Sequence, residues 1–175
     1  MGRVRRTLGR PWFITVVVTG VVLVGAGLYW FQPWKLWVDE TVRDPLPMAE
    51  AGSSAQAPPE DLARGKLISH EHETSGSVRI LRLADGTRVL RLTDLSTSNG
   101  PALKVWLTDA EVKPGKDGWH VFDDGRHVSL GDLKGNKGDQ NYTLPAGLDL
   151  NRYRSVTIWC DRFDVSFGAT ELTRV

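Results

Sequence analysis

The sequence has a single cysteine in 175 residues, which excludes an internal disulfide and a Cys-x-x-Cys-His motif for covalent haem attachment. It also lacks the Gly-x-Ser-x-Gly and His-Glu-x-x-His motifs of hydrolases and the phosphate loop of nucleotide-binding proteins. The glycine-rich segment 131–138 has no Gly-Lys-Ser/Thr ending. With a net charge of +1, the chain carries no general basic excess for nucleic acid. These absences favour a protein that is not an enzyme of a common class and does not bind nucleic acid.

Charge is absent from residues 13–31, a run of 19 residues. A helix needs about 20 apolar residues to cross the hydrocarbon core of a bilayer. Aromatic residues flank the run at both ends, as they do at membrane interfaces. The sequence therefore predicts a transmembrane helix over residues 12–31. A cleaved signal peptide is the alternative, with a small-residue site at Val24-Gly25-Ala26, but the apolar run continues past that site and favours a retained anchor.

Basic and acidic residues are unevenly distributed along the chain. Five of the 22 basic residues and none of the 21 acidic residues lie in residues 1–37, which leaves 17 basic and 21 acidic residues in the remainder. Because arginines before a span stay on the cytoplasmic side, we expect residues 1–11 to be a cytoplasmic basic head. The expected location is the cell membrane, with a single pass, the bilayer as a partner through residues 12–31 and the C-terminal domain extracytoplasmic.

Residues 32–62 are rich in proline and alanine and have little hydrophobic periodicity, which is typical of an extended stalk. Residues 63–175 alternate apolar and polar side chains with a period of two almost throughout. Asp85-Gly86 and Asp124-Gly125 each separate two such runs, which predicts two hairpins. Several short strands with glycine turns predict an all-β domain, an antiparallel β-sandwich or barrel-like fold, behind one N-terminal helix.

Cys160 ends the alternating run 155–160. On a strand it shares a face with Val156 and Ile158, while Thr157 and Trp159 face the other way. This alternation directs the thiol toward the apolar core, where free cysteines commonly pack as small hydrophobic residues. A free thiol outside the cell is prone to oxidation and to pairing between chains, so a functional cysteine is the second interpretation.

The histidines offer a weaker signal. His70 and His72 are two residues apart and lie on one face if the segment is a strand. With Cys160 they would supply the two-histidine, one-cysteine ligand set of blue copper sites, although a solvated turn explains the same pair. His120 and His127 flank Asp124-Gly125 and are expected on opposite strands of that hairpin.

Four long segments together resemble the DM-thirteen domain family, labelled "electron transfer DM domain". They are HETSG at 72–76, LSTSNGPALKVWL at 95–107, LGDLKGNKGDQNYTLP at 130–145, and YRSVTIWC at 153–160 followed by FDVSFG at 163–168. The four segments occur in the family's order and cover nearly all of the domain at 63–175. The resemblance does not include the anchor or the stalk.

The resemblance implies an all-β fold and a redox role for Cys160, either as a bare thiol or as a haem ligand. Haem is thus a candidate cofactor that the sequence does not establish, with Cys160, His72 and Trp159 as its candidate binding residues. The leading interpretation is a membrane-anchored redox or electron-transfer module that meets an external redox or envelope partner. A non-catalytic binding or scaffold module, with Cys160 as core packing, is the alternative, and a small metal site at His70 and His72 is a third.

Overall fold

The computed structural model describes residues 11–48 and 58–175, and the chain divides into two compact units, Met1–Lys35 and Leu36–Val175. The arginines of the expected basic head lie outside the described residues, as does the part of the expected stalk at 49–57.

The described part of the first unit contains one α-helix, α2 (Pro11–Phe31), of 21 residues, none of them buried. At 1.5 Å per residue it is about 31 Å long, close to the thickness of a bilayer core. Proline at the first helical position is favourable because its missing N–H has no partner there in any helix. Length and composition therefore qualify α2 as a membrane span or as a signal sequence near the N-terminus.

The helix ends at Phe31, and the two residues that follow explain why. Gln32 adopts a left-handed conformation with φ of 44°, and its N–H donates to the carbonyl of Leu28 at 2.9 Å. Pro33 follows and cannot donate to a continuing helix. A short 3₁₀ turn, η1 (Pro33–Trp37), then leads out of the first unit.

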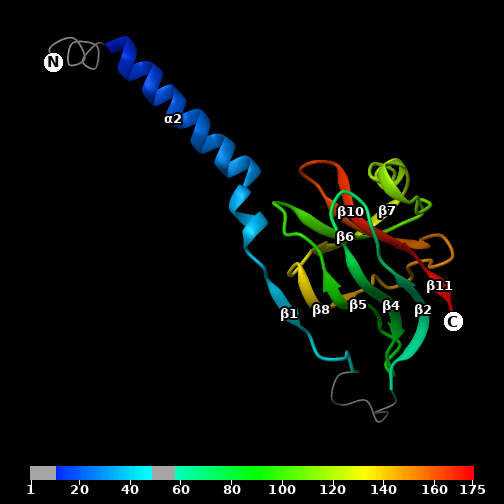
Figure 1. The fold of residues 1–175 in the computed structure, drawn as a ribbon. Helices are drawn as coiled ribbons and strands as arrows, with labels where there is room; N and C mark the ends of the chain where they lie inside the picture. Colours follow the sequence, from blue (N-terminus) through cyan, green and yellow to red (C-terminus); the bar gives the residue numbers. More distant parts are fainter. Residues whose placement is uncertain (1–10, 49–57) are drawn as a thin grey trace. The chain divides into compact units, whose positions relative to one another are not determined.

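The second unit is a sandwich of two sheets (Figure 1). One sheet has six strands, in the order β1 (Thr41–Arg43), β8 (Lys137–Thr143), β5 (Arg88–Ser96), β4 (Ser75–Arg82), β2 (Glu60–Lys66) and β11 (Thr173–Arg174). The other has five, in the order β3 (Ile68–Ser69), β10 (Val165–Glu171), β9 (Ser155–Cys160), β6 (Leu103–Thr108) and β7 (His127–Asp132). All pairings are antiparallel except β1 with β8. The prediction of an all-β antiparallel sandwich is confirmed; the sheets are open and form no closed barrel within the described residues.

Aliphatic side chains from the facing surfaces of the two sheets form the main core. Val78, Ile80, Leu90 and Leu92 come from the six-stranded sheet, and Ile158 comes from the centre of the five-stranded sheet. All five have no exposed surface. Each alternates with residues on the opposite face of its strand, as the period-two pattern of the sequence requires.

The two hairpin predictions have different outcomes. Asp85-Gly86 joins β4 to β5, with Gly86 at φ +85° and the N–H of Leu83 donating to the carbonyl of Thr87. The hairpin at Asp124-Gly125 is wrong: no strand precedes it, and β7 pairs with β6 instead. The side chain of Asp109 explains the difference, because it accepts from the N–H of Arg126 at 2.8 Å and holds this turn inside a long loop.

Part of the segment expected as a stalk belongs to the six-stranded sheet. β1 pairs in parallel with β8, and the N–H of Lys137 donates to the carbonyl of Glu40. A Cβ at Gly138 would lie 2.0 Å from the carbonyl oxygen of Val42, so glycine there makes room for β1. Residues 60–62 also lie in the sheet, at the start of β2.

Candidate redox site

Cys160 is the last residue of β9, the central strand of the five-stranded sheet. Its neighbours across the sheet are Leu103 on β6 and Val165 on β10. It belongs to the main core together with Val156 and Ile158, as the alternation predicts. The side chain has no exposed surface, and it is the only cysteine of the chain.

The turn after β9 closes over this end of the strand. The N–H of Asp161 donates to the carbonyl of Ala102 at 3.0 Å, and the N–H of Phe163 donates to the carbonyl of Cys160 at 3.2 Å. Asp164 completes the turn in a left-handed conformation, φ 49°, which aspartate tolerates better than most residues. These contacts fix the backbone of residues 161–164 against the loop that precedes β6.

Two opposing effects act on the thiol of Cys160. Burial raises the pKa of Cys160, while hydrogen bonds from the backbone N–H groups of Arg162, Phe163 and Ala102 lower it in part. Burial prevails because a thiolate loses its hydration in an apolar core. The resting group is therefore a neutral thiol.

Trp159 lies on the other face of β9 and so does not share the surroundings of Cys160. It is buried in a second, smaller cluster with Trp106, Phe122 and Ala169, which we call the outer cluster. The loop between β6 and β7 supplies Phe122 and covers this face of the sheet. Cys160 and Trp159 are therefore adjacent in sequence but point into different packing environments.

His70 is a buried structural residue. Its Nε2 lies 3.0 Å from the carbonyl oxygen of Lys113, and its Nδ1 lies 2.7 Å from the hydroxyl of Ser166. Because a carbonyl can only accept, Nε2 carries the proton and Nδ1 accepts from Ser166. Both ring nitrogens are thereby engaged, and neither is available to a metal.

His72 has different neighbours. Its ring lies 4.0 Å from that of Phe167, a core residue, whereas the ring of His70 stacks on Phe122 of the outer cluster at 5.8 Å. Its Nε2 lies 2.5 Å from a carboxylate oxygen of Glu71. Among the described residues no group of three or more histidine, cysteine, aspartate or glutamate side chains could hold a metal ion.

The surroundings of Cys160 do not fit a haem. A side chain without accessible surface adjoins no space as large as a water molecule, inside the protein or outside it. A thiolate-ligated haem needs an open cavity at the sulfur. Trp159, proposed as part of its wall, faces away from the thiol.

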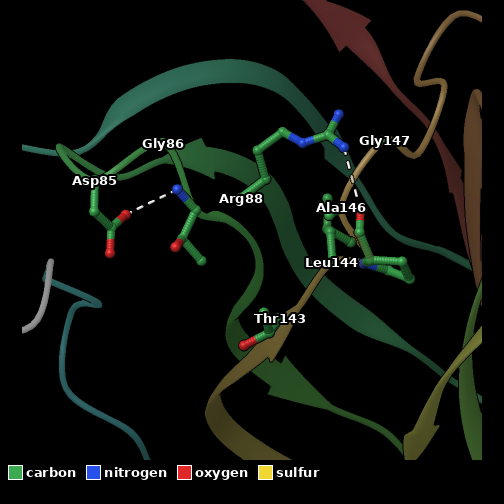
Figure 2. Close-up of a pocket in the computed structure, with 9 residues that line it drawn as sticks. Asp85, Gly86, Arg88, Thr143, Leu144, Ala146 and Gly147 are labelled. Atoms are coloured by element: carbon green, nitrogen blue, oxygen red, sulfur yellow. Dashed lines mark hydrogen bonds between the residues drawn. The ribbon is translucent and has the colours of Figure 1, made fainter.

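Several surface hollows of the described residues lie away from Cys160. Figure 2 shows one between the β4–β5 turn and the segment after β8, lined by Asp85, Arg88 and Gly147 among others. The guanidinium of Arg88 there donates to the carbonyls of Leu148 and Pro145. It is occupied in holding the turn, and neither Cys160 nor His72 lines this hollow.

In a comparison with protein families, residues 66–172 match the family described as Electron transfer DM13. The chain belongs to this family. No curated protein and no solved structure matches the chain. The DM13 match begins at the last residue of β2 and ends before β11, so β1 and most of β2 extend the six-stranded sheet beyond it.

Most of the outer cluster of this DM13 domain was not predicted from the sequence. Trp106 stacks on Trp159 at 5.1 Å and on His127 at 3.9 Å. A signal was available: in the run 103–107, Lys104 and Trp106 alternate with three core residues, so this tryptophan had to lie on the outer face. The covering loop, which brings in Phe122, has no such periodicity.

Proposed function

We propose that the chain is a membrane-anchored, extracytoplasmic redox module in which Cys160 reacts as a bare thiol. The carrying observation is an unpaired, fully buried thiol at the end of a strand, closed over by the short turn 161–164. Membership in the Electron transfer DM13 family supports a redox role. The haem form of this hypothesis has no support in the surroundings of Cys160, so we do not propose it.

The proposed reaction is thiol–disulfide exchange with an external protein. The thiolate of Cys160 attacks one sulfur of the partner's disulfide, a new S–S bond forms, and the partner's other sulfur leaves as a thiolate that takes up the proton lost by Cys160. A single cysteine cannot resolve this mixed disulfide, so a thiol of the partner does so.

Access requires the turn at 161–164 to open, because the thiol is fully buried. Local openings of this kind occur with free energies well below that of global unfolding. The opening lifts one short turn and leaves the neighbouring strands paired. We therefore propose that the turn is the gate of the site.

The gate can be tested with a matched pair of variants. Asp164 and Asp94 both have left-handed backbones, with φ of 49° and 51°, but Asp94 lies in β5 of the other sheet. A β-branched residue in this conformation costs about 1–3 kcal/mol. The strain raises the free energy of the closed turn and so favours its opening. Asp164→Val should therefore speed the reaction of Cys160 with glutathione disulfide about tenfold, because a factor of ten corresponds to about 1.4 kcal/mol.

The control Asp94→Val should leave that rate unchanged at low denaturant, and Cys160→Ala should form no adduct by mass spectrometry. Equal acceleration by both valine variants would mean that only global unfolding exposes the thiol. That outcome, or no adduct with the folded wild-type protein, would favour the alternative of a binding module with Cys160 as packing.

The membrane part of the proposal rests on α2. Its 21 uncharged residues match a bilayer span, and the arginines before it favour a cytoplasmic N-terminus. Protease treatment of sealed membrane vesicles, cytoplasmic side inward, should digest the domain and spare the N-terminal residues. A mature chain beginning after Ala26 would instead identify α2 as a cleaved signal sequence.

A further inference from the structure

The outer cluster contains a continuous stack of aromatic rings on the face of the five-stranded sheet opposite to Cys160. Three consecutive strands of this sheet, β9, β6 and β7, each contribute one ring. Figure 1 labels β6 and β7. The rings of His127 and Trp106 are 3.9 Å apart and nearly parallel at 6°, and those of Trp106 and Trp159 are 5.1 Å apart at 23°. The rings of His127 and Trp106 are therefore closely stacked, and those of Trp106 and Trp159 are stacked with a wider spacing and a larger tilt.

The stack runs from the surface into the protein. His127 is exposed, Trp106 is 7% exposed, and Trp159 is 1% exposed. Register explains the contact: Trp106 pairs with Thr157 and Lys104 pairs with Trp159, so the two indoles are diagonal neighbours on adjacent antiparallel strands. Phe122 closes the inner end, with its ring 6.4 Å from that of Trp159.

The indole nitrogen of Trp106 has an unusual environment. Nε1 is buried and has no hydrogen-bond partner among the described residues, although a buried indole N–H usually finds one. An indole that loses an electron becomes acidic at Nε1, and in water it gives up that proton. Nε1 of Trp106 has no hydrogen-bond acceptor among the described residues, so we expect the oxidised ring to keep its proton and its positive charge.

We propose that the Trp106–Trp159 pair is a one-electron redox site, with His127 at its surface end. A strong one-electron oxidant outside the chain, of the class of a high-valent metal-oxo centre, takes one electron from Trp106 at the His127 side and is itself reduced by one electron. The radical cation is shared with Trp159, and spreading one charge over two rings reduces the cost of holding it in a buried place. A one-electron reductant returns the electron, and no proton is transferred in either step.

This site is distinct from Cys160 in position and in chemistry. Thiol–disulfide exchange moves two electrons and one proton at a sulfur in the main core, whereas the indole pair moves one electron on the outer face. A lone thiol does not supply a one-electron route. The indole pair supplies one that ends near the surface, which suits a domain of an electron-transfer family. The inference goes beyond the proposed function and does not depend on it.

The experiment uses the full-length chain in detergent and photogenerated tris(bipyridine)ruthenium(III) as the oxidant. Transient absorption should show an indole radical cation that persists, together with a near-infrared band arising from charge shared between two stacked rings. Trp106→Phe and Trp159→Phe should each abolish this band, because phenylalanine keeps the packing but is far harder to oxidise. Far-ultraviolet circular dichroism and thermal unfolding verify that both variants are folded.

Two further tryptophans serve as controls. Trp37 is 80% exposed, and Trp119 also has a buried Nε1 without a partner in the described residues but is not part of the stack. Trp37→Phe and Trp119→Phe should leave the near-infrared band intact. If the band is absent from the wild-type protein, survives in Trp106→Phe, or disappears in Trp119→Phe, the proposal is overturned.

A last variant separates this proposal from the thiol reaction. Cys160→Ser removes thiol exchange and should leave the near-infrared band in place. Loss of thiol exchange in a gate experiment therefore says nothing against the indole pair. Loss of the band in Cys160→Ser would show that the two sites are one and would overturn the inference as stated.

Discussion

The two faces of β9 lie in different packing environments, although their residues alternate along one strand. On the inner face Val156, Ile158 and Cys160 lie in an aliphatic core closed by the second sheet. On the outer face Thr157 and Trp159 lie under a long loop, among aromatic rings and hydroxyl groups. The inner face owes its stability to close apolar packing, and the outer face also to specific polar contacts.

Cys160 and Trp159 are covered by different elements, and this determines how each of them can become accessible to solvent. A sheet covers Cys160, so only a local opening at the strand end exposes the thiol. A loop covers Trp159, and the stack through Trp106 already reaches an exposed histidine. The two faces can therefore be perturbed independently, and the following substitutions test this from the largest expected effect to the smallest.

Ile158→Ala perturbs the inner face most. Ile158 has no exposed surface, and truncating a buried isoleucine costs about 2–5 kcal/mol, through lost burial and the cavity left behind. The free energy of unfolding in urea should fall by that amount. Ile68→Ala is the control: Ile68 is 38% exposed on a two-residue strand, and its loss should cost about 0.5 kcal/mol or less. Similar costs at both positions would mean that the inner face is not the main core.

Much of the inner face could be predicted from the sequence, because a strict period of two records which side chains point inward. Val156, Ile158 and Cys160 were assigned to one face and Trp159 to the other on this basis alone. The Asp85-Gly86 hairpin was predictable as well, because its partners are adjacent in sequence. Both predictions depend only on residues that are close together in the sequence.

The contacts of the outer face could not be predicted, because they join segments far apart in the chain. His70 appeared to share a strand face with His72, yet its partners are Ser166 and the carbonyl of Lys113. The Asp124-Gly125 turn has a hairpin sequence, but the carboxylate of Asp109 places it in the covering loop. The pairing of β1 with β8 was hidden for the same reason.

Acid should weaken the outer face through His70. Burial lowers the pKa of His70, and the hydrogen bond to the Lys113 carbonyl raises it in part. With the folded-state pKa below the unfolded value of about 6.5, the unfolded chain binds more protons in acid. The stability contributed by neutral His70 is therefore complete above about pH 6.5 and is lost as the pH falls toward the folded-state pKa.

Urea unfolding between about pH 8 and pH 5 measures this dependence. The wild-type protein should lose stability on acidification, and His70→Gln should lose less, since glutamine can replace both hydrogen bonds without a titrating group. His120→Gln, at an exposed histidine, should behave like the wild type. An equal slope in wild type and His70→Gln would assign the acid sensitivity to other groups.

The smallest expected change is at His127, where the outer face meets the solvent. An aromatic pair contributes about 0.5–1.5 kcal/mol beyond its buried area, and the exposure of His127 places this contact near the lower end. His127→Ala should therefore lower the free energy of unfolding by about 0.5 kcal/mol and shift the tryptophan emission to the red, because water then reaches the Trp106 ring. His127→Phe restores a stacked ring and should reverse both effects. If alanine and phenylalanine give the same emission, His127 does not shield Trp106, and the surface end of the stack must lie elsewhere.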